Sequence, residues 1–249
     1  MIYPHLLPWR SPLAFSHGDS CNRWRRIAGL GIALFVLLAQ PGLAAQWQSV
    51  DTTDDGIEIF RKEVEDRLVA FRGVGVVDAP LPLVATVIFD AGRRQEWIEG
   101  LVESRILRWG GKDSFVEYDH IDMPIFFQDR DFVSKITMNF DLPGKMTFHY
   151  QPADDPSAPR TSHIRGELLD TTFILSSLDN GKKTHVDAEF LSDPKGSIPK
   201  WLVNFFVKDW PKKTFRKLRK EVLKLDISMD PRFSNLLPRE SIGPKDLRE

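Results

Sequence analysis

The 249-residue chain contains a single cysteine, Cys21. Cys21 precedes the apolar run 27–39, in a part of the chain that we expect to be removed on export. The exported form would then have no disulfide, and a buried hydrophobic core must stabilise it. Removal of the first 44 residues leaves 205, which is enough to form such a core.

The chain also lacks a long hydrophobic run. The apolar run 27–39 has 13 residues, whereas a transmembrane helix needs about 20. Arginines at positions 23, 25 and 26 precede it, and small residues end the segment 40–44. This order predicts an export signal cleaved after Ala44, and hence a periplasmic or secreted protein. The alternative is an uncleaved segment that anchors the protein to the inner membrane. Residues 1–22 match no part of a signal.

No charge of one sign dominates the sequence. The formal net charge is −1, and cleavage after Ala44 would remove four basic residues and one acidic residue, which leaves −4. This balance argues against nucleic acid as the main partner.

Motifs of enzymes and of cofactor sites are missing as well. The chain has no G-x-S-x-G nucleophile motif, and the glycine pair at 110–111 is a turn signal rather than a phosphate-binding loop. Four histidines lie on presumed strands without the spacing of metal ligands: His120, His149, His163 and His185. We therefore expect no catalysis, no cofactor and no metal.

What is present is an α+β pattern. Alternating apolar residues predict strands at 57–62, 68–74, 101–109, 114–121, 129–140, 145–150, 163–178 (as one strand or two) and 184–192. Two prolines open a helix that ends near residue 89, and 91–97 form a second short helix. A long amphipathic helix is predicted from about 198 to 225, capped by Ser197 and kinked at Pro211. Residues 226–249 are expected to form an extended tail.

Two segments resemble those of START domains, the steroidogenic-acute-regulatory-related lipid-transfer family. Residues 123–133, which end in Arg-Asp-Phe-Val, resemble that family's Pro-Trp-Pro-x-x-x-Arg-Asp-Phe-Val segment, although Ile125 and Phe126 replace its tryptophan and second proline. Residues 193–204, which begin Asp-Pro-Lys-Gly, are similar to the segment that leads into its last helix. The resemblance covers residues 45–225 and suggests an exported bacterial member. It implies a helix-grip fold, in which a curved antiparallel sheet of about nine strands wraps a long C-terminal helix around a lipid-sized tunnel.

The resemblance implies that a monomer binds and transfers one lipid without reaction: a sterol, phospholipid, fatty acid or isoprenoid. Exposing a ~16-carbon chain to water costs on the order of 12 kcal/mol, so only a closed apolar tunnel can carry it. Candidates for the tunnel lining are Phe115, Ile136, Met138, Phe148, Phe173, Phe190, Trp201 and Phe205. Two alternatives remain: these side chains fill the solid core of an interaction module, or the container holds a cyclase- or hydrolase-like enzyme.

Glu117 falls on the acid position of an acid–base pair found in some sterol-handling members, and Ile136 replaces the base. A carboxyl group in an apolar tunnel without a base would be partly protonated, or held by water, and would bind the polar end of the ligand. Arg165 is an alternative partner for Glu117. An exposed position on the outer face of the sheet is the other interpretation.

Two segments could contact a membrane. Leu142, Pro143 and Gly144 fall on the loop that gates the tunnel in the family, although an ordinary hairpin turn explains them too. The basic run 208–220 of the last helix predicts transient contact with anionic headgroups, or else a solvated helix face.

Overall fold

The computed structural model describes residues 46–64, 68–124 and 126–236. Residues 1–22, the predicted signal segment and the chain after Leu236 lie outside the described residues. Among the described helices, none combines the length and the apolar character needed to cross a membrane.

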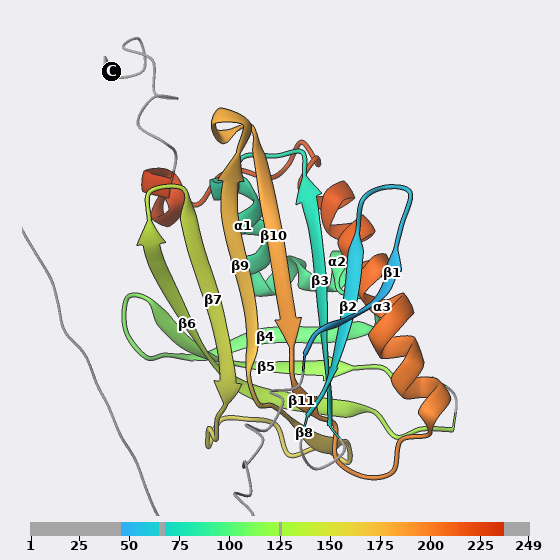
Figure 1. The fold of residues 1–249 in the computed structure, drawn as a ribbon. Helices are drawn as coiled ribbons and strands as arrows, with labels where there is room; N and C mark the ends of the chain where they lie inside the picture. Colours follow the sequence, from blue (N-terminus) through green and yellow to red (C-terminus); the bar gives the residue numbers. More distant parts are fainter. Residues whose placement is uncertain (1–45, 65–67, 125, 237–249) are drawn as a thin grey trace, which may run out of the picture. The chain divides into compact units, whose positions relative to one another are not determined.

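One large sheet dominates this part of the chain (Figure 1). Its strands are β1 (Gln48–Thr52), β2 (Glu58–Glu63), β3 (Val69–Val77), β4 (Leu101–Trp109), β5 (Ser114–Ile121), β6 (Arg130–Leu142), β7 (Lys145–Pro152), β8 (Ile164–Leu168), β9 (Thr171–Leu178), β10 (Lys183–Phe190) and β11 (Ser192–Asp193). The strand order is β1-β2-β3-β10-β9-β7-β6-β5-β4, while β8 lies beside β6 and β11 beside β8. The predicted strands are confirmed, and β1 and β11 are additional.

The sheet is mixed, whereas the sequence predicts an antiparallel one. β6 and β8 run parallel, with Arg130 opposite Ile164. A tight hairpin can only reverse the chain, and parallel strands need a longer connection. The connection of residues 153–163 between β7 and β8 is long enough to bring β8 alongside β6 in the same direction.

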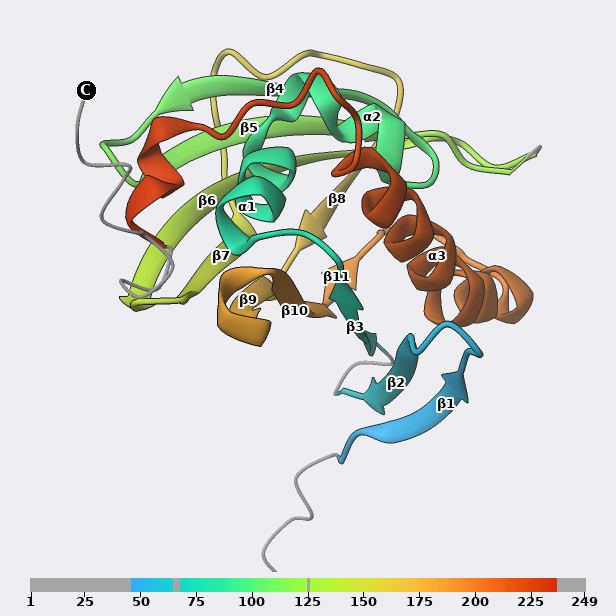
Figure 2. The ribbon, with the colours of Figure 1, turned by 90° about the horizontal axis from the view of Figure 1, so that it is seen from above.

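Three α-helices accompany the sheet: α1 (Leu81–Phe89), α2 (Arg94–Trp97) and α3 (Lys200–Glu221), with 3₁₀ turns η2 (Ala91–Arg93), η3 (Asp179–Gly181) and η4 (Pro231–Leu236). α1 is apolar on nearly all sides, as expected of a helix buried within a core. Figure 2 shows α1 inside the curve of the sheet. α3 contacts β2, β3 and α2, and so covers the open side of the curved sheet.

The ends of α3 differ from the prediction. Pro199 precedes its first turn and no side chain caps it, so the predicted cap by Ser197 is wrong. α3 runs through Pro211 as one helix and ends at Glu221, four residues earlier than expected, and Leu225 is exposed.

The described part of the predicted extended tail folds back onto the domain. Phe233 and Leu236 in η4 are buried, and Phe233 lies against Phe89 and Phe148, with ring centroids 5.7 and 6.3 Å apart. Residues three apart in a 3₁₀ helix share a face, so both apolar side chains point the same way. Two isolated apolar residues carry too little periodicity to predict this packing.

The interior of the curved sheet has a solid half and a hollow half. Inward side chains alternate along each strand, and on β5 they are Phe115, Glu117 and Asp119. Phe115 belongs to a core formed with α1 and η4. Asp119 lines a cavity beside α3, and Glu117 lies between the two halves.

Candidate ligand cavity

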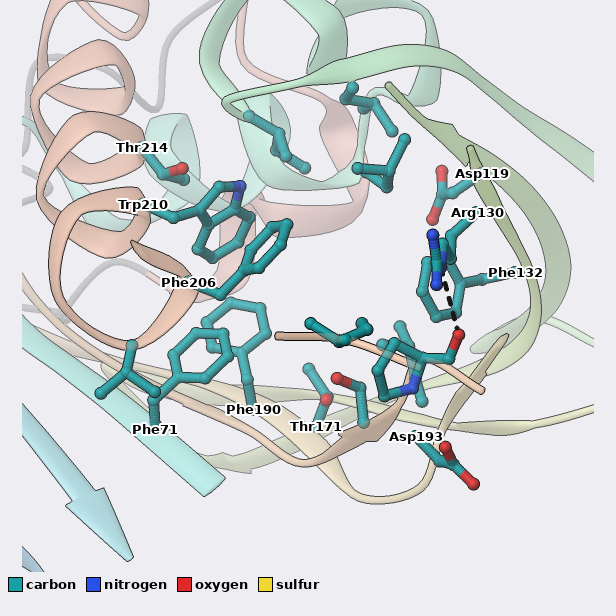
Figure 3. Close-up of a pocket in the computed structure, with 18 of the residues that line it drawn as sticks. Phe71, Asp119, Arg130, Phe132, Thr171, Phe190, Asp193, Phe206, Trp210 and Thr214 are labelled. Atoms are coloured by element: carbon teal, nitrogen blue, oxygen red, sulfur yellow. Dashed lines mark hydrogen bonds between the residues drawn. The ribbon is translucent and has the colours of Figure 1, made fainter. Parts of the chain in front are cut away.

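A cavity of about 520 Å³ lies between the sheet, α2 and α3 (Figure 3). Aromatic side chains form much of its wall. Phe190 contacts Phe71, Phe173 and Trp210, with ring centroids 4.8, 5.3 and 5.2 Å apart. The volume falls within the range of about 300–1,000 Å³ that is typical of small-molecule sites.

One part of the cavity wall carries polar groups. Within the described part of the protein, four cavity-lining residues have a buried polar atom without a hydrogen-bond partner: Arg94 (Nη2), Trp97 (Nε1), Asp119 (Oδ1) and Thr171 (Oγ1). Tyr150, opposite Thr171 in the sheet, also lines the cavity. A buried polar atom that lacks a hydrogen-bond partner destabilises the protein by about 1–3 kcal/mol. The arrangement therefore suits a ligand with a polar end.

Arg94 and Glu117 form a buried ion pair at the boundary between core and cavity. Both side chains are almost completely buried, and Arg94 Nη1 donates to Glu117 Oε2. Of the two positions that the sequence left open for Glu117, the structure has the inward one. The partner of Glu117, however, is Arg94, whereas Arg165 pairs with Asp131 at 2.6 Å.

The electrostatics of this pair follow from its burial. Desolvation raises the pKa of Glu117 to about 8, against the attraction of the Arg94 guanidinium. Burial acts to lower the pKa of Arg94, but the Glu117 carboxylate more than offsets this and the pKa is raised. Burial also raises the pKa of Tyr150. Arg94 therefore stays charged, and its free Nη2 can donate to a ligand.

Local structure positions Arg94. The Asp90 side chain accepts a hydrogen bond from Gly92 N at 3.1 Å and so caps the turn that leads into α2. Arg94 Nε donates to Ile88 O at 2.9 Å. Carbonyls in the last turn of a helix lack partners within that helix, and Arg94 satisfies one of them at the end of α1.

The two sequence segments that resemble START domains meet at the cavity. Arg130 Nε donates to Pro194 O at 3.3 Å, the bond drawn as a dashed line in Figure 3. Arg130 Nη2 donates to Lys195 O, also at 3.3 Å, and the two bonds tie β6 to the segment before α3. Phe132 lines the cavity and packs on Gly166, where an added Cβ would lie 2.5 Å from the Phe132 ring. These contacts hold the two segments against each other at one side of the cavity.

The predicted lining residues separate into three groups. Phe173 and Phe190 line the cavity. Four others are buried in the core near α1 and η4 rather than in the cavity wall: Phe115, Ile136, Met138 and Phe148. Trp201 is 56% exposed, and Phe205 packs on Phe206, which is one of the α3 residues that line the cavity.

The predicted gate loop is the tight turn between β6 and β7. Leu142 pairs with Lys145, Gly144 has a φ of 79°, and Ser177 N donates to Gly144 O at 2.7 Å. This turn lies at the opposite end of β6 from Arg130 and Phe132, which line the cavity. Its geometry is that of the ordinary hairpin turn.

Sequence reasoning missed Arg94, Trp97, Asp119, Tyr150 and Thr171. Asp119 could have been found, because it is two residues from Glu117 on the same strand and therefore shares its face. The other four become neighbours only when α2, β7 and β9 come together, and no spacing in the sequence indicates this.

A curved sheet that encloses a cavity against a long C-terminal helix defines the helix-grip class of α+β proteins. The sequence pattern of the START domain matches residues 36–225. The chain belongs to the START domain family, whose members are lipid-binding domains.

Several relatives are similar over most of their length. An uncharacterized protein of Pseudomonas aeruginosa is 30% identical over 196 residues, which cover 78% of this chain and 95% of that protein. Human phosphatidylcholine transfer protein is 28% identical over 180 residues, 69% of this chain and 82% of the relative.

Solved structures agree in fold. Human StAR-related lipid transfer protein 5 superposes with a TM-score of 0.65 at 20% identity, over 71% of this chain and 86% of that one. A fragment of a STAR-related lipid transfer protein from Xanthomonas axonopodis has a TM-score of 0.60 at 24% identity, over 72% and 99% of the two chains.

Proposed function

We propose that this protein binds one lipid in the 520 Å³ cavity and transfers it between membranes without a chemical reaction. The observation that carries the proposal is the combination of an aromatic wall with buried polar atoms that lack partners. An acyl or ring system would contact Phe71, Phe173 and Phe190. The polar end would lie against Arg94, Asp119 and Thr171.

Phosphatidylcholine is the first candidate ligand. A human relative is a phosphatidylcholine transfer protein. A phosphate oxygen can accept from Arg94 Nη2 and Thr171 Oγ1, while Asp119 and aromatic faces suit the quaternary ammonium group. An uncharged lipid hydroxyl, which both donates and accepts, is the competing chemistry.

We also propose that the N-terminal end of α3 makes the transient membrane contact. Phe126 is 99% exposed and Trp201 is 56% exposed, and the ring of Phe127, the residue after Phe126, lies 5.7 Å from the Trp201 ring. Interfacial aromatic side chains favour the headgroup region of a membrane. The basic run 208–220 is less available, because five of its side chains pair with the acids Asp51, Asp55 and Glu99.

Native mass spectrometry of the purified protein, followed by extraction of the bound molecule, tests the binding proposal. Val203 lines the cavity from α3, and Val203→Trp should narrow the cavity and reduce retained lipid at least several-fold. Val102→Trp makes the same change at a half-exposed position on β4 and should retain lipid normally. Equal retention by both variants, or a wild-type protein that takes up no lipid, would contradict the proposal.

Thr171→Val tests the polar end. Thr171 Oγ1 has no protein partner, so its loss should not lower the stability of the lipid-free protein. The change should weaken phosphatidylcholine binding roughly 2- to 10-fold, the value of one hydrogen bond. Ser134→Ala is the matched control, since Ser134 Oγ is also buried and unpaired but lies outside the cavity lining. Vesicle-to-vesicle transfer assays with phosphatidylcholine, phosphatidylglycerol and a sterol identify the preferred class. Turnover of a lipid that depends on Glu117 would instead indicate an enzyme.

A further inference from the structure

Two histidines and an aspartate come together on the side of β5 that faces away from the cavity. His120 lies on β5 between the cavity-lining Asp119 and Ile121, so its side chain points to the other face of the sheet. Asp129 immediately precedes β6, and His163 immediately precedes β8. Ile164 N donates to Asp129 O at 3.0 Å, which holds the starts of these two strands side by side.

The three side chains are in contact. His120 Nε2 lies 2.9 Å from Asp129 Oδ2, and the two imidazole rings stack with centroids 4.1 Å apart and an interplanar angle of 20°. One ligand atom from each residue lies within 4.8 Å of the others. All three residues are partly buried, so the cluster is accessible from solvent.

The chemistry of the cluster fits a transition-metal ion. Imidazole nitrogen and carboxylate oxygen bind Zn²⁺ at about 2.0–2.2 Å, which places ligand atoms about 3–4 Å apart. The carboxylate is already oriented, because Asp129 Oδ1 accepts a hydrogen bond from Met123 N at 3.0 Å. Hydrogen bonds of this kind hold ligands in metal sites. Only His163 must turn out of the stack, about its χ2 torsion, which is broad for histidine.

Charge also favours a cation. Burial acts to raise the pKa of Asp129, but hydrogen bonds from Met123 N and His120 outweigh it and the pKa is lowered, so the group is a carboxylate at neutral pH. Neutral imidazole and ionised carboxylate are the forms that bind metal.

We propose that His120, Asp129 and His163 bind one divalent transition-metal ion of the Zn²⁺ class, with water completing its coordination. The ion would join β5, the connection of residues 122–129 and the start of β8. That connection carries Met123 in the cavity wall and the exposed Phe126, so the metal would fix one side of the cavity.

Isothermal titration of the chelator-treated, untagged full-length chain with Zn²⁺ alone tests the site. We expect one equivalent bound with a micromolar or lower dissociation constant, and at least a tenfold loss of affinity in His163→Gln. His149→Gln is the matched control: His149 Nε2 pairs with Asp170 Oδ1 at 2.8 Å, but in the described residues this pair has no third ligand within reach. Its Zn²⁺ affinity should equal that of the wild type.

A second measurement does not depend on variants. Long-range ¹⁵N–¹H spectra of the imidazoles should shift for His120 and His163 on addition of Zn²⁺ and stay unchanged for His149. Absence of saturable binding, shifts at all histidines alike, or equal losses in the His163 and His149 variants would overturn the proposal.

Discussion

Removing one member of the buried Arg94–Glu117 pair should destabilise the protein far more than removing both. Glu117→Leu leaves the Arg94 guanidinium, which cannot lose its proton, in a site that is 2% exposed. An uncompensated buried charge of this kind costs about 3–5 kcal/mol. Arg94→Met leaves Glu117, which can take up a proton because burial already raises its pKa to about 8. Because Glu117 of the wild type is itself protonated at pH 6, the variants are to be compared at pH 9, where both groups of the pair are charged.

The double variant Arg94→Met/Glu117→Leu buries no charge and fills the site with apolar side chains of similar size. Replacing a buried pair in this way is often neutral or stabilising. We expect its free energy of unfolding to lie above that of Glu117→Leu by at least 2 kcal/mol, because the double variant no longer buries an unpaired charge. Its lipid selectivity should also shift away from polar headgroups, because Arg94 Nη2 is lost.

Urea denaturation of the lipid-free proteins at pH 9, above the pKa of Glu117, measures the full double-mutant cycle. Arg105→Met is the control, since Arg105 and Glu103 form a half-exposed pair at 3.2 Å that should contribute less than about 1 kcal/mol. Strictly additive costs in the double variant would refute the reasoning, because additivity means that the two groups do not interact.

Three further predictions follow from the same structure. The pKa of Glu117 is near 8 in the folded state and 4.5 in its ordinary environment, so the unfolded chain loses this proton at lower pH than the folded protein does. The free energy of unfolding should therefore fall as pH rises from 4.5 to 8. Glu117→Gln should flatten this pH profile in urea titrations. Phe233→Ala should cost about 3–5 kcal/mol, measured as a lower thermal midpoint, because Phe233 is fully buried; an unchanged midpoint would show that η4 does not stabilise the fold. We propose that the protein acts after export, and mass spectrometry of the expressed product should find a chain that begins at Ala45; a full-length product held in the membrane would favour the uncleaved anchor.

Several residues of the candidate site follow from local patterns and others do not. Phe173 and Phe190 lie on strands in which apolar and polar residues alternate, and the prediction that they face inward was correct. The same alternation cannot separate them from Phe115 and Phe148, which face inward equally but meet α1 and η4. Whether an inward side chain lines a cavity or fills a core depends on what lies opposite, and this is set by packing between distant segments.

The histidines give a second example. His120 and His163 are 43 positions apart and match no metal-ligand spacing, yet the parallel pairing of β6 and β8 stacks their rings. That pairing depends on a long connection rather than on a turn with a recognisable sequence. Predictions based on local spacing therefore miss such clusters.

By itself the sequence determined the α+β class and most strand and helix positions, because period-2 and period-3.6 patterns and turn residues act over a few neighbouring positions. The helix-grip fold was implied by the resemblance of residues 123–133 and 193–204 to START domains. The sequence left open whether Glu117 faces inward or lies exposed on the outer face of the sheet. Only the tertiary structure decided which half of the interior is hollow, which base pairs with Glu117 and which polar atoms remain free for a ligand. These properties arise where α2, α3 and separate strands converge, and such contacts depend on the sum of many weak long-range interactions rather than on any one segment.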